Sequence, residues 1–158
     1  MSETYIEIMI QSLKKKIQVL DQIIELDELQ KEQLEDPLAS ADDFDQTVED
    51  KAALIQQLDQ LDSGFDKLYS RVKEELQGNK EAFSEQIAKM QELIRSITDR
   101  SVKIQSQEAR NKNLMTQKFA KVKKQVKEVR TNTKVANQYY RNMTRVNYID
   151  PQFMDNKK

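Results

Sequence analysis

Apolar residues recur in the first part of the chain at alternating spacings of four and three. The series runs from Ile6 to Ile24, and its members are Ile6, Ile10, Leu13, Ile17, Leu20 and Ile24. This alternation is typical of the buried seam of an amphipathic helix. Pro37 lacks a backbone N–H and restricts the residue before it, so we expect the helix to end at or just before Asp36. The first predicted helix covers residues 4–35.

A second apolar stripe predicts a helix over residues 44–77. Its members are Phe44, Val48, Ala52, Ile55, Leu58, Leu61 or Asp62, Phe65, Leu68 or Tyr69, Val72 and Leu76. The preceding segment "SADDFDQ" offers Ser and Asp as N-caps. Gly64 lies inside this stripe, where glycine costs about 1 kcal/mol relative to alanine, so we expect the helix to continue through it with at most a local bend. Gly78 is expected to stop the helix, with Asn79 as the next N-cap.

The third stripe predicts a helix over residues 80–142. Its first seam contains Phe83, Ile87, Met90, Ile94, Ile97, Ser101, Ile104, Glu108, Asn111 and Met115, after which the seam shifts by one residue, as in a stutter. About 60 residues would form a helix of roughly 90 Å, against roughly 50 Å for each of the other two. The shorter helices should therefore cover the third only up to about residues 115–120. We expect the polar seam positions Ser101, Glu108 and Asn111 to lie towards a solvated end.

The apolar stripe beyond that point has no evident partner within the chain. The residues that we predict to bind a partner are Phe119, Val122, Val126, Val129, Ala136, Tyr139, Tyr140 and Met143. Two interpretations remain open: docking of another protein, and self-association of a structural coiled-coil protein through the same helix.

Composition supports an all-α fold. Of the 158 residues, 37% are hydrophobic and 34% are charged, and Gly and Pro occur twice each, which is close to the profile of long helices and coiled coils. We predict an antiparallel three-helix coiled-coil bundle whose third helix is longer than the other two. It would form one domain over residues 1–145, followed by a flexible tail over 146–158 whose apolar residues Tyr148, Phe153 and Met154 could pin it to a groove.

The net charge of −1 hides a strong asymmetry between the two halves. Residues 1–79 hold 8 Lys and Arg against 19 Asp and Glu, a net charge of −11, and residues 80–158 hold 18 against 8, a net charge of +10. The halves should attract each other if the chain folds back on itself.

Catalytic chemistry has little support in the sequence. The chain has no Cys and no His, which excludes thiolate and imidazole catalysis, disulfides and the usual zinc sites. The acidic run "ADDFDQ" lacks the ligand spacing of a calcium loop, and there is no glycine-rich phosphate loop. We therefore expect no enzymatic activity and no cofactor or metal. No apolar run approaches the roughly 18–20 residues that span a bilayer, so the sequence predicts a soluble, cytoplasmic protein.

A basic run lies at the start of the unpartnered stripe, at Lys118, Lys121, Lys123, Lys124, Lys127 and Arg130. It could contact nucleic acid or a membrane surface. We favour a solvated helix face, or one set against the acidic half, because aromatic residues do not interleave with it before Tyr139 and its apolar side is thin.

The order of these features resembles the FlgN-type flagellar export chaperones. The resemblance spans about Ile6 to Tyr140 and rests on the acidic N-terminal heptads, the break at Pro37, "LDQLDSGFDKLYSRVKEEL" and "IQSQEARNKNLMTQKF". It implies a small cytoplasmic helical protein that binds hook-filament junction proteins before their export through the flagellar type III apparatus. It also implies that the C-terminal amphipathic helix contacts the client, and here that helix is the unpartnered stripe.

Overall fold

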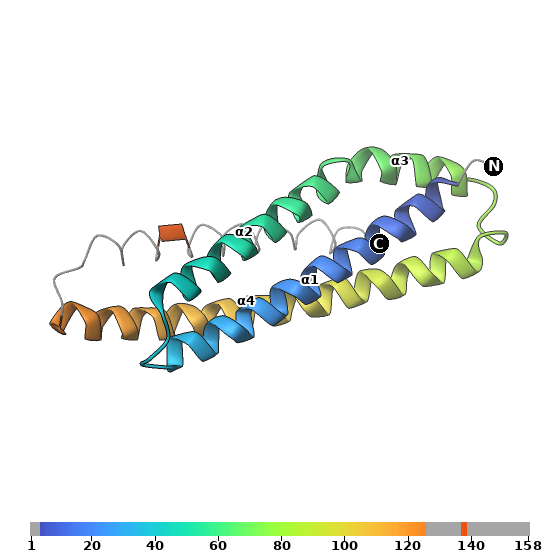
Figure 1. The fold of residues 1–158 in the computed structure, drawn as a ribbon. Coiled ribbons are helices and arrows are strands. Elements are labelled where there is room, and N and C mark those ends of the chain that lie inside the picture. Colours follow the sequence, from blue (N-terminus) through green and yellow to red (C-terminus); the bar gives the residue numbers. More distant parts are fainter. Residues whose placement is uncertain (1–3, 126–136, 139–158) are drawn as a thin grey trace.

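The protein is a bundle of long helices (Figure 1). A computed structural model describes residues 4–125 and 137–138. Its helices are α1 (Tyr5–Glu35), α2 (Ala41–Ser63), α3 (Phe65–Leu76) and α4 (Ser84–Gln125), and α4 is the longest. The described residues contain no strand, which confirms the predicted all-α class.

Side-chain contacts give the direction of each helix. Lys16 pairs with Asp62, and Lys51 pairs with Asp27 further along α1, so α1 and α2 run antiparallel. Arg100 pairs with Asp21, and Asn111 donates to the carbonyl of Asp27, so α1 and α4 run parallel. The bundle therefore has an up-down-up arrangement in which α1 contacts the other three helices.

Both ends of α1 are capped by residues that are distant in sequence. At its start, the Thr4 hydroxyl accepts from the Glu7 amide, and the Glu75 carboxylate of α3 accepts from the amides of Tyr5 and Ile6 at 3.1 and 3.0 Å. At its end, Lys118 of α4 donates to the carbonyls of Gln33 and Asp36. An anion at the N-terminus and a cation at the C-terminus both favour the helix dipole. The first predicted helix thus has nearly the expected bounds.

The second predicted helix is divided. Ser40 caps α2 by accepting from the amides of Asp42 and Asp43, as the segment suggested, so α2 begins at Ala41 rather than at residue 44. At Gly64 the chain changes direction, with φ −100° and ψ 4°, and α3 follows. Continuity through Gly64 was a wrong expectation, because the ψ near zero interrupts the regular helical hydrogen bonding.

The turn between α3 and α4 is longer than predicted. Gly78 has φ +76° and stops the helix as expected, since glycine adopts this left-handed conformation without strain. Asn79 is not the cap of the next helix, however. Residues 77–83 form turns, and α4 begins at Ser84.

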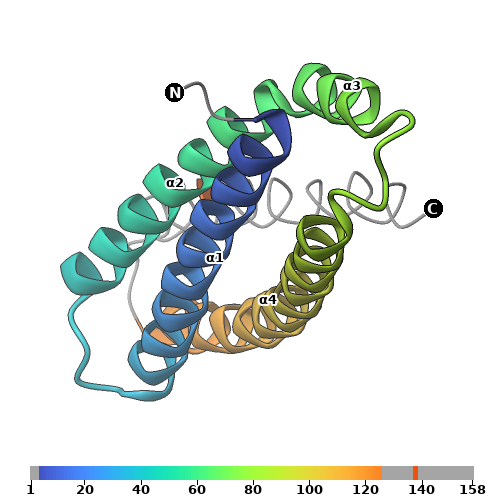
Figure 2. The ribbon, with the colours of Figure 1, turned by 90° about the vertical axis from the view of Figure 1, so that its right-hand side faces the viewer.

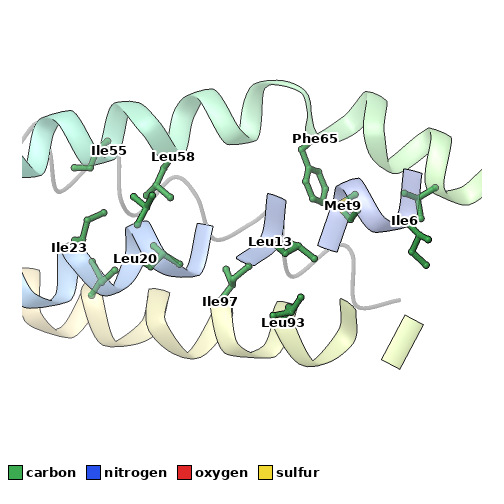
Figure 3. Packing of buried hydrophobic residues seen from close by; sticks show 13 residues of the cluster. Ile6, Met9, Leu13, Leu20, Ile23, Ile55, Leu58, Phe65, Leu93 and Ile97 are labelled. Carbon is green, nitrogen blue, oxygen red and sulfur yellow. The ribbon is translucent and has the colours of Figure 1, made fainter. Parts of the chain in front are cut away.

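One main apolar core runs along the bundle. Figure 3 shows Leu20 and Ile23 of α1, Ile55 and Leu58 of α2, and Ile97 of α4 in one stretch of it, and Ile6, Met9, Leu13, Phe65 and Leu93 in the next. These positions are the predicted seams, or lie one residue from them, so amphipathic periodicity identified the core faces. Within the described residues, no helix is both long enough and apolar enough to cross a membrane.

Candidate functional site

A second, smaller apolar cluster lies near the far end of α4. Phe44 and Val48 of α2 pack with Met115 of α4, and all three are buried. Leu34 and Phe119 are half-buried against them. This cluster closes the bundle at the end where α1 leads into α2.

The predicted partner-binding residues begin at this cluster. Phe119 is half-buried, so part of its ring already has an intramolecular partner and part remains accessible. Val122 lies within α4. The remaining six predicted residues lie outside the described part of the chain: Val126, Val129, Ala136, Tyr139, Tyr140 and Met143. The predicted tail over 146–158 also lies outside it.

A buried polar layer lies next to the cluster and joins α1, α2 and α4. The Lys51 ammonium of α2 donates to Glu108 Oε1 at 2.7 Å, Gln30 Oε1 at 2.9 Å and Asp27 Oδ1 at 3.0 Å. All four residues are essentially inaccessible to solvent. Gln30 also donates to the hydroxyl of Thr47, at 3.3 Å. Buried charges are tolerated when they are paired and hydrogen-bonded in this way.

The protonation of this layer follows from its burial. Desolvation raises the pKa of Asp27 to about 8; the neighbouring Glu108 acts in the same direction, whereas Lys51 opposes both. At neutral pH Asp27 is therefore largely protonated and can share its proton with Glu108, while Lys51 and Glu108 form the ion pair. The layer then carries no net charge, which is the least costly state for buried groups.

The polar seam positions of the third predicted helix belong to this region. Ser101, Glu108 and Asn111 are all buried, so the expectation that they lie towards a solvated end was wrong. Glu108 faces Lys51, and Asn111 donates to the backbone carbonyl of Asp27 at 2.9 Å. The signal that the sequence did offer was charge at seam-like positions of several helices, at Asp27, Lys51 and Glu108, which together make a paired set.

Further polar contacts fix how far α4 extends past α1. Gln107 donates to the carbonyl of Ile24 and to the Glu28 carboxylate, at 3.1 and 3.0 Å, and Arg110 pairs with Glu28 at 3.0 Å. These hydrogen bonds, from Gln107 first and then Arg110, lower the pKa of Glu28. Directional bonds of this kind specify register, which apolar contacts alone do not.

The result is a helix whose end projects beyond the bundle. Lys118 lies beside the end of α1, since it donates to Gln33 and Asp36, and this agrees with the predicted limit of coverage near residues 115–120. From there α4 continues to Gln125 (Figure 1), roughly two turns further. The described residues contain no cluster of three or more acidic side chains that could hold a metal.

The described residues form an all-helical bundle whose longest helix, α4, extends past the end of α1. The family comparison defines it further: the model of the FlgN protein family matches residues 1–145. The chain therefore belongs to the FlgN family, whose role is that of a flagellar export chaperone. No curated protein and no solved structure shows a significant match to the chain.

Proposed function

We propose that this protein is a cytoplasmic chaperone of flagellar type III export that binds hook-filament junction proteins through its C-terminal amphipathic helix. The binding residues would be the stripe from Phe119 to Met143, continued from α4. The observation that carries the proposal is the projection of α4 past the polar layer and past the end of α1, with Phe119 only half-covered. Membership of the FlgN family supports the choice of a flagellar export client.

The mechanism would be recognition between two helices. Apolar anchors at helical spacing would bury the apolar stripe of a client helix, while the neighbouring lysines favour acidic clients and speed association. The bound stripe of the client could then neither aggregate nor polymerise before export. The buried polar layer contributes by holding α4 in one register, so that the projecting stripe starts at a fixed place.

A matched pair of variants tests the proposal. Val126→Glu, Val129→Glu and Tyr140→Glu together place three charges on the apolar stripe. Thr131→Glu, Gln138→Glu and Asn142→Glu place the same charge on the opposite side of the same helical pattern. Titration of a labelled C-terminal helical segment of a junction protein should give no measurable binding to the first variant and near-native binding to the second. Equal binding to both variants would refute the proposed site.

Circular dichroism of the same two variants separates a binding site from a core. We expect both to melt within a few degrees of the native chain, because the described core and polar layer end at about Phe119. Cooperative unfolding of the stripe variant alone would show that the stripe is part of the core, in which case it cannot be the client site.

A further inference from the structure

The end of the bundle opposite the projecting helix contains an open apolar groove. α3 packs on α1 and makes few contacts with α4, and Figure 2 shows α3 and the first turns of α4 lying apart, joined by residues 77–83. Between these helices, over α1, lies a groove of about 560 Å³. This volume is within the range of about 300–1,000 Å³ that is common for binding sites.

The groove has an apolar floor and apolar walls. Buried Met9 and Leu13 of α1 and Phe65 and Val72 of α3 line its base. The walls are half-buried and partly open to solvent, and they are formed by Tyr69, Leu76, Ile87, Met90 and Ile94. From Ile87 to Arg95 the wall on α4 extends for roughly 12 Å. That length suits two turns of another helix, with anchors at i, i+4 and i+7.

The charged residues that line the groove are all basic. Its polar lining consists of Lys73, Lys80, Arg95 and Gln91, without a single acidic residue. The three cations are exposed, and none of them forms an ion pair within the part of the chain that the structure describes. Lys73 also lies 4.8 Å from the centre of the Tyr69 ring, at the edge of the apolar wall. A ligand with negative charge flanking an apolar stripe would match this surface.

The chain's own C-terminal segment does not match it. Residues 126–158 hold seven Lys and Arg against three Asp and Glu, so the segment has the same sign of charge as the groove. The groove is also remote from the predicted client stripe, since Met90 and Val122 are roughly 48 Å apart along α4.

We propose that the groove between α1, α3 and the start of α4 binds an acidic amphipathic helix of a partner protein, separately from the client stripe. The partner helix would insert apolar side chains between Tyr69 and Met90 and set its carboxylates beside Lys73, Lys80 and Arg95. With a client also bound at the stripe, the protein would hold two partners at once, one at each end of α4. This inference goes beyond the proposed client function and does not depend on it.

The experiment uses the full chain and two fluorescein-labelled synthetic helices of 18 residues. Both carry leucines at the i, i+4 and i+7 positions; one has glutamates on the flanks and the other has lysines there. Fluorescence polarisation should show the acidic peptide binding at least about tenfold more tightly than the basic one, an affinity difference that weakens with salt. Equal affinities, or no binding of the acidic peptide, would overturn the proposal.

Charge-reversal variants locate the binding. Lys73→Glu, Lys80→Glu and Arg95→Glu together should weaken binding of the acidic peptide at least about tenfold, because three exposed ion pairs are lost. The matched control, Lys15→Glu, Lys67→Glu and Lys103→Glu, changes the total charge equally at exposed positions outside the groove and should retain binding. Equal weakening in both would mean that only general charge attracts the peptide, and would overturn the proposal. Met90→Glu tests the apolar wall. We expect this variant to lose peptide binding while its circular dichroism stays native. Unchanged binding would contradict the groove as the binding site.

The same peptides and variants test two other occupants of the groove, a second copy of the chain and the chain's own C-terminal segment. If a second copy fills the groove, sedimentation will show a dimer that the groove variant dissociates. If the C-terminal segment fills it, the variant Val126→Glu, Val129→Glu and Tyr140→Glu will bind the acidic peptide more tightly than the native chain. Either result would overturn the proposed partner. Unchanged peptide binding by that stripe variant is expected whether or not the client interaction fails, so the two proposals can fail independently.

Discussion

The Lys51 ammonium lies 2.7 Å from Glu108 Oε1, and the exposed fractions of the two side chains are 0% and 1%. This ion pair connects α2 to α4. It lies next to the cluster of Phe44, Val48 and Met115, at the base of the projecting end of α4. The pair therefore links the stability of the bundle to the position of the predicted client stripe.

Removal of the lysine should be costly. Lys51→Met leaves Glu108 buried without its cation, and loss of one member of a buried pair costs about 3–5 kcal/mol. We expect the free energy of unfolding in urea to fall by that amount. Lys31→Met is the matched control, because Lys31 pairs with Glu35 at the surface and should cost less than about 1 kcal/mol. Similar losses in the two variants would contradict the buried role of Lys51.

The polar layer also predicts how stability depends on pH. Because burial raises the pKa of Asp27 from 3.8 to about 8, the folded chain holds a proton there that the unfolded chain has released. The contribution of Asp27 to the free energy of unfolding is therefore complete below about pH 4 and is lost as the pH rises to about 8. Asp27→Asn, which imitates the protonated acid, should flatten this decline by up to about 1.4 kcal/mol per pH unit.

The pKa of Glu28 is shifted in the opposite direction to that of Asp27, so Glu28 provides a control for the pH dependence of stability. Hydrogen bonds from Gln107 and Arg110 lower its pKa, so its contribution is present above its ordinary pKa of 4.5 and is lost as the pH falls further. Glu28→Gln should change the free energy of unfolding only at acidic pH.

The Asp27 prediction is contradicted by one result. If Asp27→Asn left the slope of stability between pH 5 and pH 8 unchanged, Asp27 would be ionised in the native protein at neutral pH.

Lys118 should hold the end of α1 in place. Lys118→Met removes the cation that donates to the carbonyls of Gln33 and Asp36, an interaction with the helix end worth about 0.3–1 kcal/mol. Hydrogen exchange should become faster over roughly the last turn of α1 and remain native near its start. Lys121→Met, at an exposed position one turn further along α4, should leave the exchange unchanged. Equal effects of both variants would argue against a specific contact.

The two glycines should respond to alanine in opposite ways. A Cβ atom at Gly64 would meet nothing within 4 Å and the local φ is negative, so Gly64→Ala should stabilise the protein by about 0.4–1 kcal/mol. At Gly78, φ of +76° disfavours any side chain, and Gly78→Ala should destabilise it by about 1–2 kcal/mol. Thermal melts of the two variants test this, and destabilisation by Gly64→Ala would show that the bend between α2 and α3 requires glycine.

The sequence allowed prediction of features that depend on local periodicity. The seam from Ile6 to Ile24, the stop before Pro37, the cap at Ser40 and the left-handed Gly78 each follow from neighbouring residues, and each is present in the structure. The all-α class was predicted from the same patterns together with the composition, and the family was suggested by the resemblance of the quoted segments; both are confirmed.

The features that were missed depend on contacts between distant residues. Glu108 and Asn111 appeared to weaken their seam, but Lys51 and the backbone of Asp27 satisfy them from other helices. Gly64 was expected to lie within one helix, but α2 ends at Ser63 and α3 begins at Phe65. The groove between α1, α3 and the start of α4 could not be predicted, because it depends on the separation of α3 from α4.

The most direct test of the client site is sedimentation velocity of the full chain, alone and mixed with the C-terminal helical segment of a hook-filament junction protein. The same measurement is made with the variant Val126→Glu, Val129→Glu and Tyr140→Glu. We predict that the native chain forms a complex with the segment and that the variant does not. A native chain that instead dimerises through these residues and does not bind the segment would contradict the account and indicate a self-associating structural protein.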